Sequence, residues 1–142
     1  MRAWTRRREE GFLAAELVAG VALLVVPVVL LVLTMPQWAE RETDARSIAR
    51  EVGRTLARSR WCDTATADAI ASRMAANLSL AARDVTAHPD CTPGALLAPG
   101  GELEVDVTVR MPPVHLPAVG DVAAWSWTAR HHEPVDVYGA EP

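Results

Sequence analysis

The residues with the clearest chemical potential lie where a charged N-terminal stretch meets a long apolar run. Residues 6–10 are arginines and glutamates, Gly11 follows them, Phe12 opens the apolar run, and Glu16 lies four positions further on. A carboxylate inside a membrane span costs about 2.5–3.5 kcal/mol on insertion scales, so Glu16 is expected to have a partner or a role. If the chain were cut between Gly11 and Phe12, a new α-amine would appear at Phe12. Glu16 would then be the fifth residue, placed to pair with the amine of a neighbouring subunit. The alternative is a carboxyl group that stays close to the cytoplasmic interface.

The two cysteines, Cys62 and Cys91, both follow the apolar run. An even pair in an exported domain predicts a disulfide, here joining the region between two helices to a proline-rich loop. Two unpaired thiols are the alternative. A zinc site is less favoured, because structural zinc takes four ligands that usually come in close pairs.

The sequence holds no recognisable catalytic motif. There is no HExxH, no nucleophile elbow and no phosphate-binding glycine motif. The adjacent His131 and His132 would point to opposite faces of a strand, which argues against a shared metal ion with His88 or His115. The net charge of −4 gives no general nucleic-acid signal. The sequence therefore predicts a protein that is not an enzyme, with no cofactor, no metal and no nucleic-acid partner.

The apolar run is long enough to cross a membrane. Phe12 to Leu33 is a run of 22 residues with Glu16 as its only charged member. At about 1.5 Å per residue it would extend for about 33 Å, which matches a bilayer core. Trp38 falls where an interfacial aromatic residue is expected. We assign 1–11 to a cytoplasmic leader, 12–35 to a transmembrane helix and 36–142 to an extracytoplasmic domain.

The flanking charges predict the orientation of this span. Basic residues beside a span remain cytoplasmic, and four arginines precede the run whereas Arg41 and Arg46 follow it. The N-terminus is therefore expected in the cytoplasm. A cleaved secretory signal is the alternative, but its apolar region has about 7–15 residues and ends in a small-x-small site. Here the first small residue after the run, Ala39, has Gln37 two places before it.

Two amphipathic helices are predicted after the span. Pro27 lies inside the span, Pro36 is expected to end it, and a helical pattern covers 37–60. Its apolar stripe has the spacing of one helix face: Ala45, Ile48, Ala49, Val52 and Leu56. A second helix, capped by Asp63, Thr64 or Thr66, repeats that spacing: Ala67, Ile70, Ala71, Met74 and Leu78.

A small antiparallel sheet is predicted in the second half of the chain. Residues 102–111 alternate strictly between apolar and polar, 84–88 form a short strand, and 122–132 form another, with Trp125, Trp127 and Ala129 on one face. Residues 111–120 are expected to be an extended connection, and 133–142 an irregular tail. The fold class is therefore α+β, with a transmembrane helix continuing into an amphipathic helix, a second helix and a small sheet.

A basic ridge is predicted beside the apolar stripe of the first amphipathic helix. Its members recur every four residues: Arg46, Arg50, Arg54 and Arg58. Three interpretations stay open: a solvated face, contact with anionic headgroups, or contact with acidic partner subunits. Glu42 and Arg46 should also support the helix as an i, i+4 pair.

The border motif resembles the processing site of type IV pilins and their relatives. In that family a prepilin peptidase cuts after the glycine, and the glutamate at the fifth position of the mature chain aids assembly. The resemblance implies that Gly11 is the last leader residue, Phe12 the new N-terminus and Glu16 the assembly carboxylate.

The wider chain resembles the TadE-like minor pilins, or pseudopilins, of tight-adherence pili, particularly those of high-GC Gram-positive bacteria. The similar features are the arginine-rich leader, Pro27 within the span, the charged helix from Ala39 onward and the ending 129–138. The resemblance implies a membrane-anchored component of a pilus or its assembly platform, with membrane lipid, other pilin subunits and the prepilin peptidase as partners. An unprocessed, anchored accessory subunit of a secretion or envelope complex is the second interpretation.

Overall fold

The computed structural model describes residues 3–116, 120–122 and 125–137. The elements in chain order are α1 (Ala3–Ser59), α2 (Thr64–Asn77), the 3-10 turn η1 (Ala82–Asp84), β1 (Val85–Pro89), β2 (Glu102–Arg110), β3 (Val114–Leu116), β4 (Gly120–Val122) and β5 (Ser126–Pro134). The two helices come first and the strands follow. This is the α+β order predicted from the sequence.

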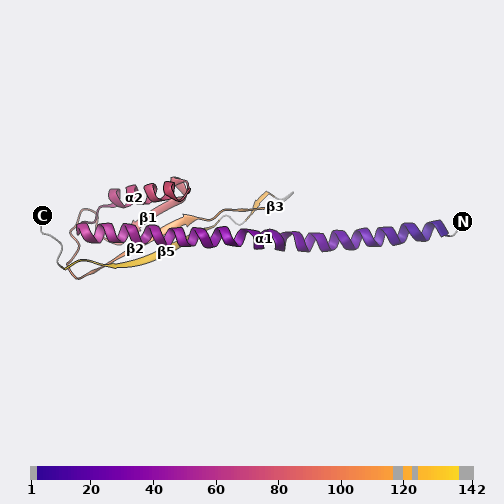
Figure 1. The fold of residues 1–142 in the computed structure, drawn as a ribbon, viewed down its shortest axis with the longest axis horizontal. Helices are drawn as coiled ribbons and strands as arrows, with labels where there is room; N and C mark the ends of the chain where they lie inside the picture. The colour runs from indigo at the N-terminus through magenta and orange to yellow at the C-terminus, as the bar shows by residue number, and fades with distance from the viewer. Residues whose placement is uncertain (1–2, 117–119, 123–124, 138–142) are drawn as a thin grey trace.

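Helix α1 dominates the shape of the molecule (Figure 1). It has 57 residues, which corresponds to a length of about 86 Å. The predicted continuation of the apolar helix into an amphipathic helix is confirmed, because α1 passes through both Pro27 and Pro36. Each proline removes one backbone hydrogen bond from the helix. The helical turns before and after each proline keep α1 continuous across the missing bond.

A small head surrounds the C-terminal part of α1. The five residues of the predicted apolar stripe, Ala45 to Leu56, are fully buried there. The second stripe is confirmed for Ala67 and Ala71, which are buried, and for Ile70 and Met74, which pack partly buried against the core, but it is wrong for Leu78, which is exposed. Helix α2 ends at Asn77, so Leu78 caps the helix instead of continuing its face. Leu80 is buried in its place.

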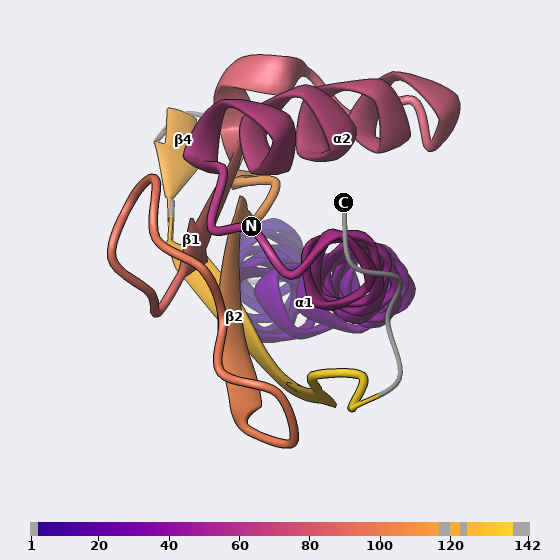
Figure 2. The same cartoon turned by 90° about the vertical axis from the view of Figure 1, so that its left-hand side faces the viewer.

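A three-stranded antiparallel sheet completes the head, in the order β1-β2-β5. The alternation predicted for β2 is confirmed, since Leu103, Val105, Val107 and Val109 are all buried. Both helices cover this apolar face: α1 packs on β2 and β5, and α2 packs on β1 (Figure 2). The opposite face of the sheet carries polar residues. The head is therefore a two-layer structure with its core between helices and sheet.

The segment between β2 and β5 differs from the prediction. The expected extended connection over 111–120 contains β3, and β3 pairs with β4 in a separate two-stranded antiparallel sheet. Val114 is buried, and β3 contacts α1. Figure 1 shows β3 nearer to the N-terminal half of α1 than the larger sheet is. Residues 117–119 lie outside the described part of the chain.

Strand β5 begins and ends later than predicted. It runs from Ser126 to Pro134, so the predicted strand over 122–132 includes part of β4 and stops short of the true end. Trp127 and Ala129 face the core as expected, whereas Trp125 precedes the strand. The tail was predicted to be irregular from residue 133, but Val135 is buried and exchanges backbone hydrogen bonds with Gly100 and Gly101, just before β2. The final residues, 138–142, lie outside the described part.

Candidate functional site: an exposed apolar helix with a carboxylate

The N-terminal half of α1 has almost no protein around it. From Ala15 to Val29 every residue is exposed, including large apolar side chains at Leu17, Leu23 and Leu24. In the described part of the chain, one helix is long and apolar enough to cross a membrane, and this segment supplies its apolar residues. An exposed apolar surface of this extent is typical of a site that lipid or other apolar helices cover.

Glu16 lies within this exposed apolar surface. Its side chain is exposed, and it makes no hydrogen bond or ion pair with any residue that the structure describes. If this segment spans a membrane, a group that compensates the charge has to come from another molecule, because the hydrocarbon core holds little water. The sequence prediction that this carboxylate requires a partner or a role remains a prediction, because the structure contains a single chain.

Gly11 and Phe12 both lie inside α1, since the helix begins at Ala3. Glu16 follows Phe12 by four residues, which is about 6 Å along the axis and slightly more than one full turn. A peptidase acting between Gly11 and Phe12 would have to unwind this turn, because a helical peptide bond is shielded by its neighbouring turns.

Gly20 is a second feature of the exposed segment. A Cβ built on Gly20 would have no atom of this chain within 4 Å, so nothing in the fold of the single chain requires glycine. Glycine in a helix interior costs about 1 kcal/mol relative to alanine. In membranes, small residues on a helix face permit close approach of a second helix. Together with Ala15 and Ala19, Gly20 gives the segment several positions with little steric bulk.

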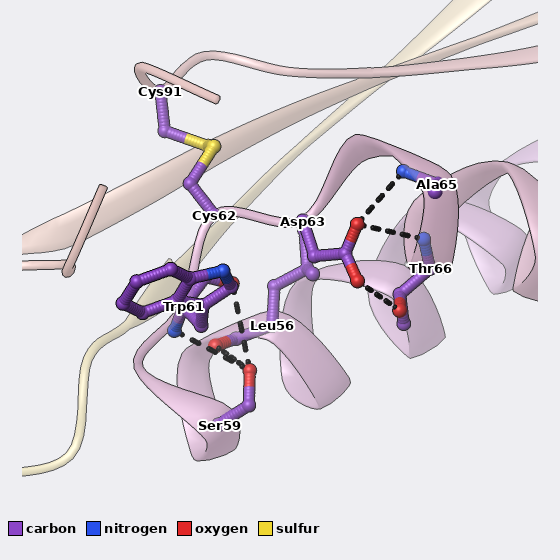
Figure 3. Close-up of a disulfide and its surroundings, with 8 residues drawn as sticks. All are labelled: Leu56, Ser59, Trp61, Cys62, Asp63, Ala65, Thr66 and Cys91. Carbon is purple, nitrogen blue, oxygen red and sulfur yellow. Dashed lines mark hydrogen bonds between the residues drawn. A yellow bond between two sulfur atoms is a disulfide. The ribbon is translucent and has the colours of Figure 1, made fainter. Parts of the chain in front are cut away.

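The Cys62–Cys91 disulfide predicted from the sequence is present (Figure 3). The two Cα atoms are 6.1 Å apart, inside the usual range for a disulfide. Cys62 is fully buried between α1 and α2, and Cys91 follows β1. The crosslink therefore joins the helical layer to the loop between β1 and β2.

Backbone hydrogen bonds reinforce that crosslink. The Cys62 N–H donates to the Ala95 carbonyl oxygen at 2.9 Å, and the Gly94 N–H donates to the Cys62 carbonyl oxygen at 2.8 Å. The Leu97 N–H donates to the Arg60 carbonyl oxygen at 2.9 Å. The proline-rich loop is thus held against the far end of α1 by both covalent and hydrogen bonds.

Asp63 caps α2, one of the three caps that the sequence allowed. Its carboxylate accepts hydrogen bonds from the backbone N–H groups of Ala65 and Thr66, at 3.0 and 3.2 Å, and from the Thr66 hydroxyl (Figure 3). The Thr66 hydroxyl is the largest cause of a lowered pKa for Asp63, followed by the backbone N–H groups. The charged cap fixes where α2 begins, directly after the disulfide.

The arginine ridge runs along α1 on its exposed side. Arg46 forms an ion pair with Glu42, as predicted, and its guanidinium lies 5.3 Å from the centre of the Trp127 ring. The other three arginines are exposed and make no hydrogen bond or ion pair with the described residues. From Arg46 to Arg58 the ridge extends for about 18 Å along the helix axis. A membrane surface crossed by α1 near its normal would meet only one end of this ridge, so the geometry favours solvent or an acidic partner over headgroups.

The polar face of the sheet carries an ion-pair network. Arg130 donates to both carboxylate oxygens of Asp106, at 3.0 and 3.1 Å, and its Nε lies 2.9 Å from a Glu104 oxygen. Its hydrogen bond to Asp106, followed by the charges of Asp106 and Glu104, raises the pKa of Arg130. The charges on this face are largely satisfied among themselves, which favours a structural role over a catalytic one.

The histidines are separated, as strand geometry predicts. His131 faces the helices, with Nε2 2.8 Å from a Glu133 carboxylate oxygen. His132 faces the opposite side, 3.6 Å from Glu102 and 3.7 Å from Glu104. Among the residues that the structure describes, no group of histidine, cysteine or carboxylate side chains is arranged to hold a metal ion.

Sequence reasoning missed the role of Gly53. This glycine is buried in α1, and a Cβ there would lie 3.2 Å from His131 Cδ2 and 3.3 Å from Glu133 Cβ. Glycine therefore allows α1 to approach β5 closely. The signal in the sequence was a lone glycine within a helical pattern, which often has a packing reason.

Comparison of the chain with protein-family models, with characterised proteins and with solved structures finds no match.

Proposed function

We propose that this chain is a single-span membrane protein of the pilin type, cleaved after Gly11 and assembled with other pilin-like spans into a pilus or its assembly platform. The N-terminus is cytoplasmic, and the head lies outside the cytoplasm. The observation that carries the proposal is an unpartnered carboxylate, Glu16, on an otherwise apolar helix.

A pure lipid anchor gains nothing from Glu16. Burying its charge in a bilayer is unfavourable, and an apolar residue would anchor the chain better. A carboxylate at this position is useful when a neighbouring chain supplies a cation. An α-amine freed at Phe12 would be such a cation, and it would lie near the depth of Glu16 in a neighbouring parallel span.

The shape of the chain also supports this proposal. One unbroken helix carries the apolar segment and the core of the head. Parallel copies could therefore pack their apolar halves together while the heads remain outside. Gly20, Ala15 and Ala19 favour close helix packing within such a bundle.

The first experiment identifies the N-terminus of the protein purified from membranes of cells that contain the peptidase. Mass spectrometry should find Phe12 as the first residue, with four arginines and two glutamates of the leader removed. The variant Gly11→Ala should retain Met1, because the cleavage site is lost. An intact Met1 on the parent chain, or normal cleavage of Gly11→Ala, would contradict processing and favour the unprocessed accessory subunit.

The second experiment tests Glu16 itself. Glu16→Gln should insert and be cleaved normally, since a neutral amide is cheaper to bury than a carboxylate. It should nevertheless be recovered poorly in assembled pili or in complexes with other pilin spans, because it lacks the charge that binds the amine. Glu51→Gln, an exposed carboxylate on the head part of α1, is the matched control and should assemble normally. If Glu16→Gln assembles as well as the parent, the assembly role of Glu16 is refuted.

A further inference from the structure

Two tryptophans from distant parts of the sequence meet at the edge of the head that is nearest the apolar segment. The rings of Trp38 and Trp125 are in edge-to-face contact, with centroids 5.9 Å apart. The Trp38 Nε1–H donates to the Pro112 carbonyl oxygen at 3.2 Å. We call the surface formed by Trp38, Pro112 and Trp125 the tryptophan edge. Trp38 lies only five residues after Leu33, the last residue of the apolar run, which is about 8 Å along α1.

This edge continues onto the apolar run itself. Between Ala15 and Trp38, Leu30, Thr34 and Trp38 are the half-buried residues among otherwise exposed ones. They are spaced by four, so they share one face of α1. The Trp38 side chain is hydrogen-bonded to the backbone of Pro112, which lies just before β3, and β3 itself contacts α1. The small sheet of β3 and β4 therefore lies beside the last turns of the apolar run.

We infer that the tryptophan edge lies in the headgroup and carbonyl layer of the bilayer, so that the head rests on the membrane surface. The inference depends on the membrane anchoring proposed above. Tryptophan prefers this layer because its ring is apolar while its N–H still finds a polar partner. Trp125 is 41% exposed, although it is a large aromatic residue at the margin of the core. Lipid would cover that surface.

Charge does not explain the contact. Three arginines lie near the tryptophan edge, and so do three carboxylates: Arg41, Arg83, Arg110, Glu40, Asp44 and Asp84. The edge has no clear excess of positive charge among these groups. Binding should therefore depend little on the fraction of anionic lipid, which distinguishes this surface from an electrostatic, polybasic one.

The position of β3 also limits the depth of the span. Strand edges do not occur in the hydrocarbon core facing lipid, because their backbone groups would lose hydrogen bonds. The hydrocarbon core should therefore end near Leu30, and the lipid-covered part of the apolar run should be about 18 residues, from Phe12 to Val29. At about 1.5 Å per residue this gives about 27 Å, enough for a bilayer of ordinary or slightly reduced thickness.

The test uses full-length chains that each retain one tryptophan, reconstituted in two sets of vesicles, one with lipids brominated near the headgroup and one with lipids brominated deep in the acyl chains. The first variant retains Trp125, and the matched control retains Trp61, with the other tryptophans replaced by phenylalanine. The two are almost equally exposed, at 41% and 45%. Trp61 follows the far end of α1, about 32 Å beyond Trp38 along the axis. A third variant replaces Leu24 with the single tryptophan and reports on insertion.

Bromines near the headgroup should strongly quench the emission of Trp125, bromines deep in the acyl chains should quench the Leu24→Trp probe, and neither should change the emission of Trp61. The quenching of Trp125 should be the same in zwitterionic and anionic vesicles. If the Leu24→Trp probe is quenched but Trp125 behaves like Trp61, the span is inserted and the inference about the tryptophan edge is overturned. If the Leu24→Trp probe is not quenched, membrane anchoring itself fails, and the inference fails with it. Resistance of the cysteines to alkylation in each variant verifies that the head is folded.

Discussion

Removing the Cys62–Cys91 disulfide should destabilise the head without affecting the apolar segment. The appropriate perturbation is the double variant Cys62→Ala/Cys91→Ala, because alanine leaves no polar group at the fully buried position 62. Reduction of the parent chain is an independent route to the same open state. Neither change touches residues 12–35.

The magnitude follows from the size of the closed loop. The two cysteines are separated by 29 residues, for which the chain-entropy relation gives about 3.6 kcal/mol at 25 °C. Total stabilities of single domains are about 5–15 kcal/mol, so the loss would be a large fraction of the whole. The unfolded state should also become more expanded, which would raise the dependence of the unfolding free energy on urea concentration.

The assay is urea unfolding of the full chain in detergent micelles, followed by circular dichroism. The double variant should unfold at a clearly lower urea concentration than the oxidised parent, and the reduced parent should resemble the double variant. Reductant should have no effect on the double variant, which controls for unrelated effects of the reagent. If oxidised parent and double variant unfold at the same midpoint, or if unreduced parent is labelled by an alkylating reagent, the reasoning is refuted.

Two further predictions concern the ends of α2. Leu80→Ala should lower the free energy of unfolding by about 2–4 kcal/mol, because a buried leucine is lost. Leu78→Ala, at an exposed position, is the control and should change it by less than about 0.5 kcal/mol. Equal effects of the two changes in urea unfolding would contradict the assignment of Leu80 to the core. Asp63→Ala should lower the free energy of unfolding at pH 7, because the charged cap of α2 is lost. Since the pKa of Asp63 is lowered in the folded protein, the stabilisation by the cap is present above the ordinary pKa of 3.8. It is lost as the pH falls through the folded-state pKa. The difference in urea midpoint between parent and Asp63→Ala should therefore shrink from pH 7 to pH 3, and a constant difference would exclude the charged cap as its cause.

Local periodicity explains why so much of the fold could be predicted. The buried stripe from Ala45 to Leu56 and the alternation of β2 each depend on a single element meeting one core, so spacing alone identifies the inward face. The Cys62–Cys91 pair was predictable because there were two cysteines on the same side of the span. The sequence also identified Glu16, since a charge in an apolar run is visible without any structure.

Other features depend on contacts between distant residues, and spacing could not reveal them. Leu78 fits the helical stripe, but Ser79 adopts a positive φ of 58° and the chain turns, so Leu80 enters the core. Gly53 reflects the approach of β5 to α1, and the pairing of Trp38 with Trp125 joins segments that lie far apart in the sequence.

Because α1 is continuous, a single helix joins the apolar segment to the head. No loop separates the apolar half of α1 from the half that packs in the head, so a change in the tilt of the apolar half is transmitted directly to the head. The part of α1 from Pro36 to Ser59 is about 36 Å long. A tilt of about 20°, typical of membrane helices, would displace the far end sideways by about 12 Å. Contact of the tryptophan edge with the bilayer would resist such a swing, whereas packing among parallel helices would set its angle. If α1 spans a membrane as proposed, the position of the disulfide-linked end would depend on forces that act at the opposite end of the same helix.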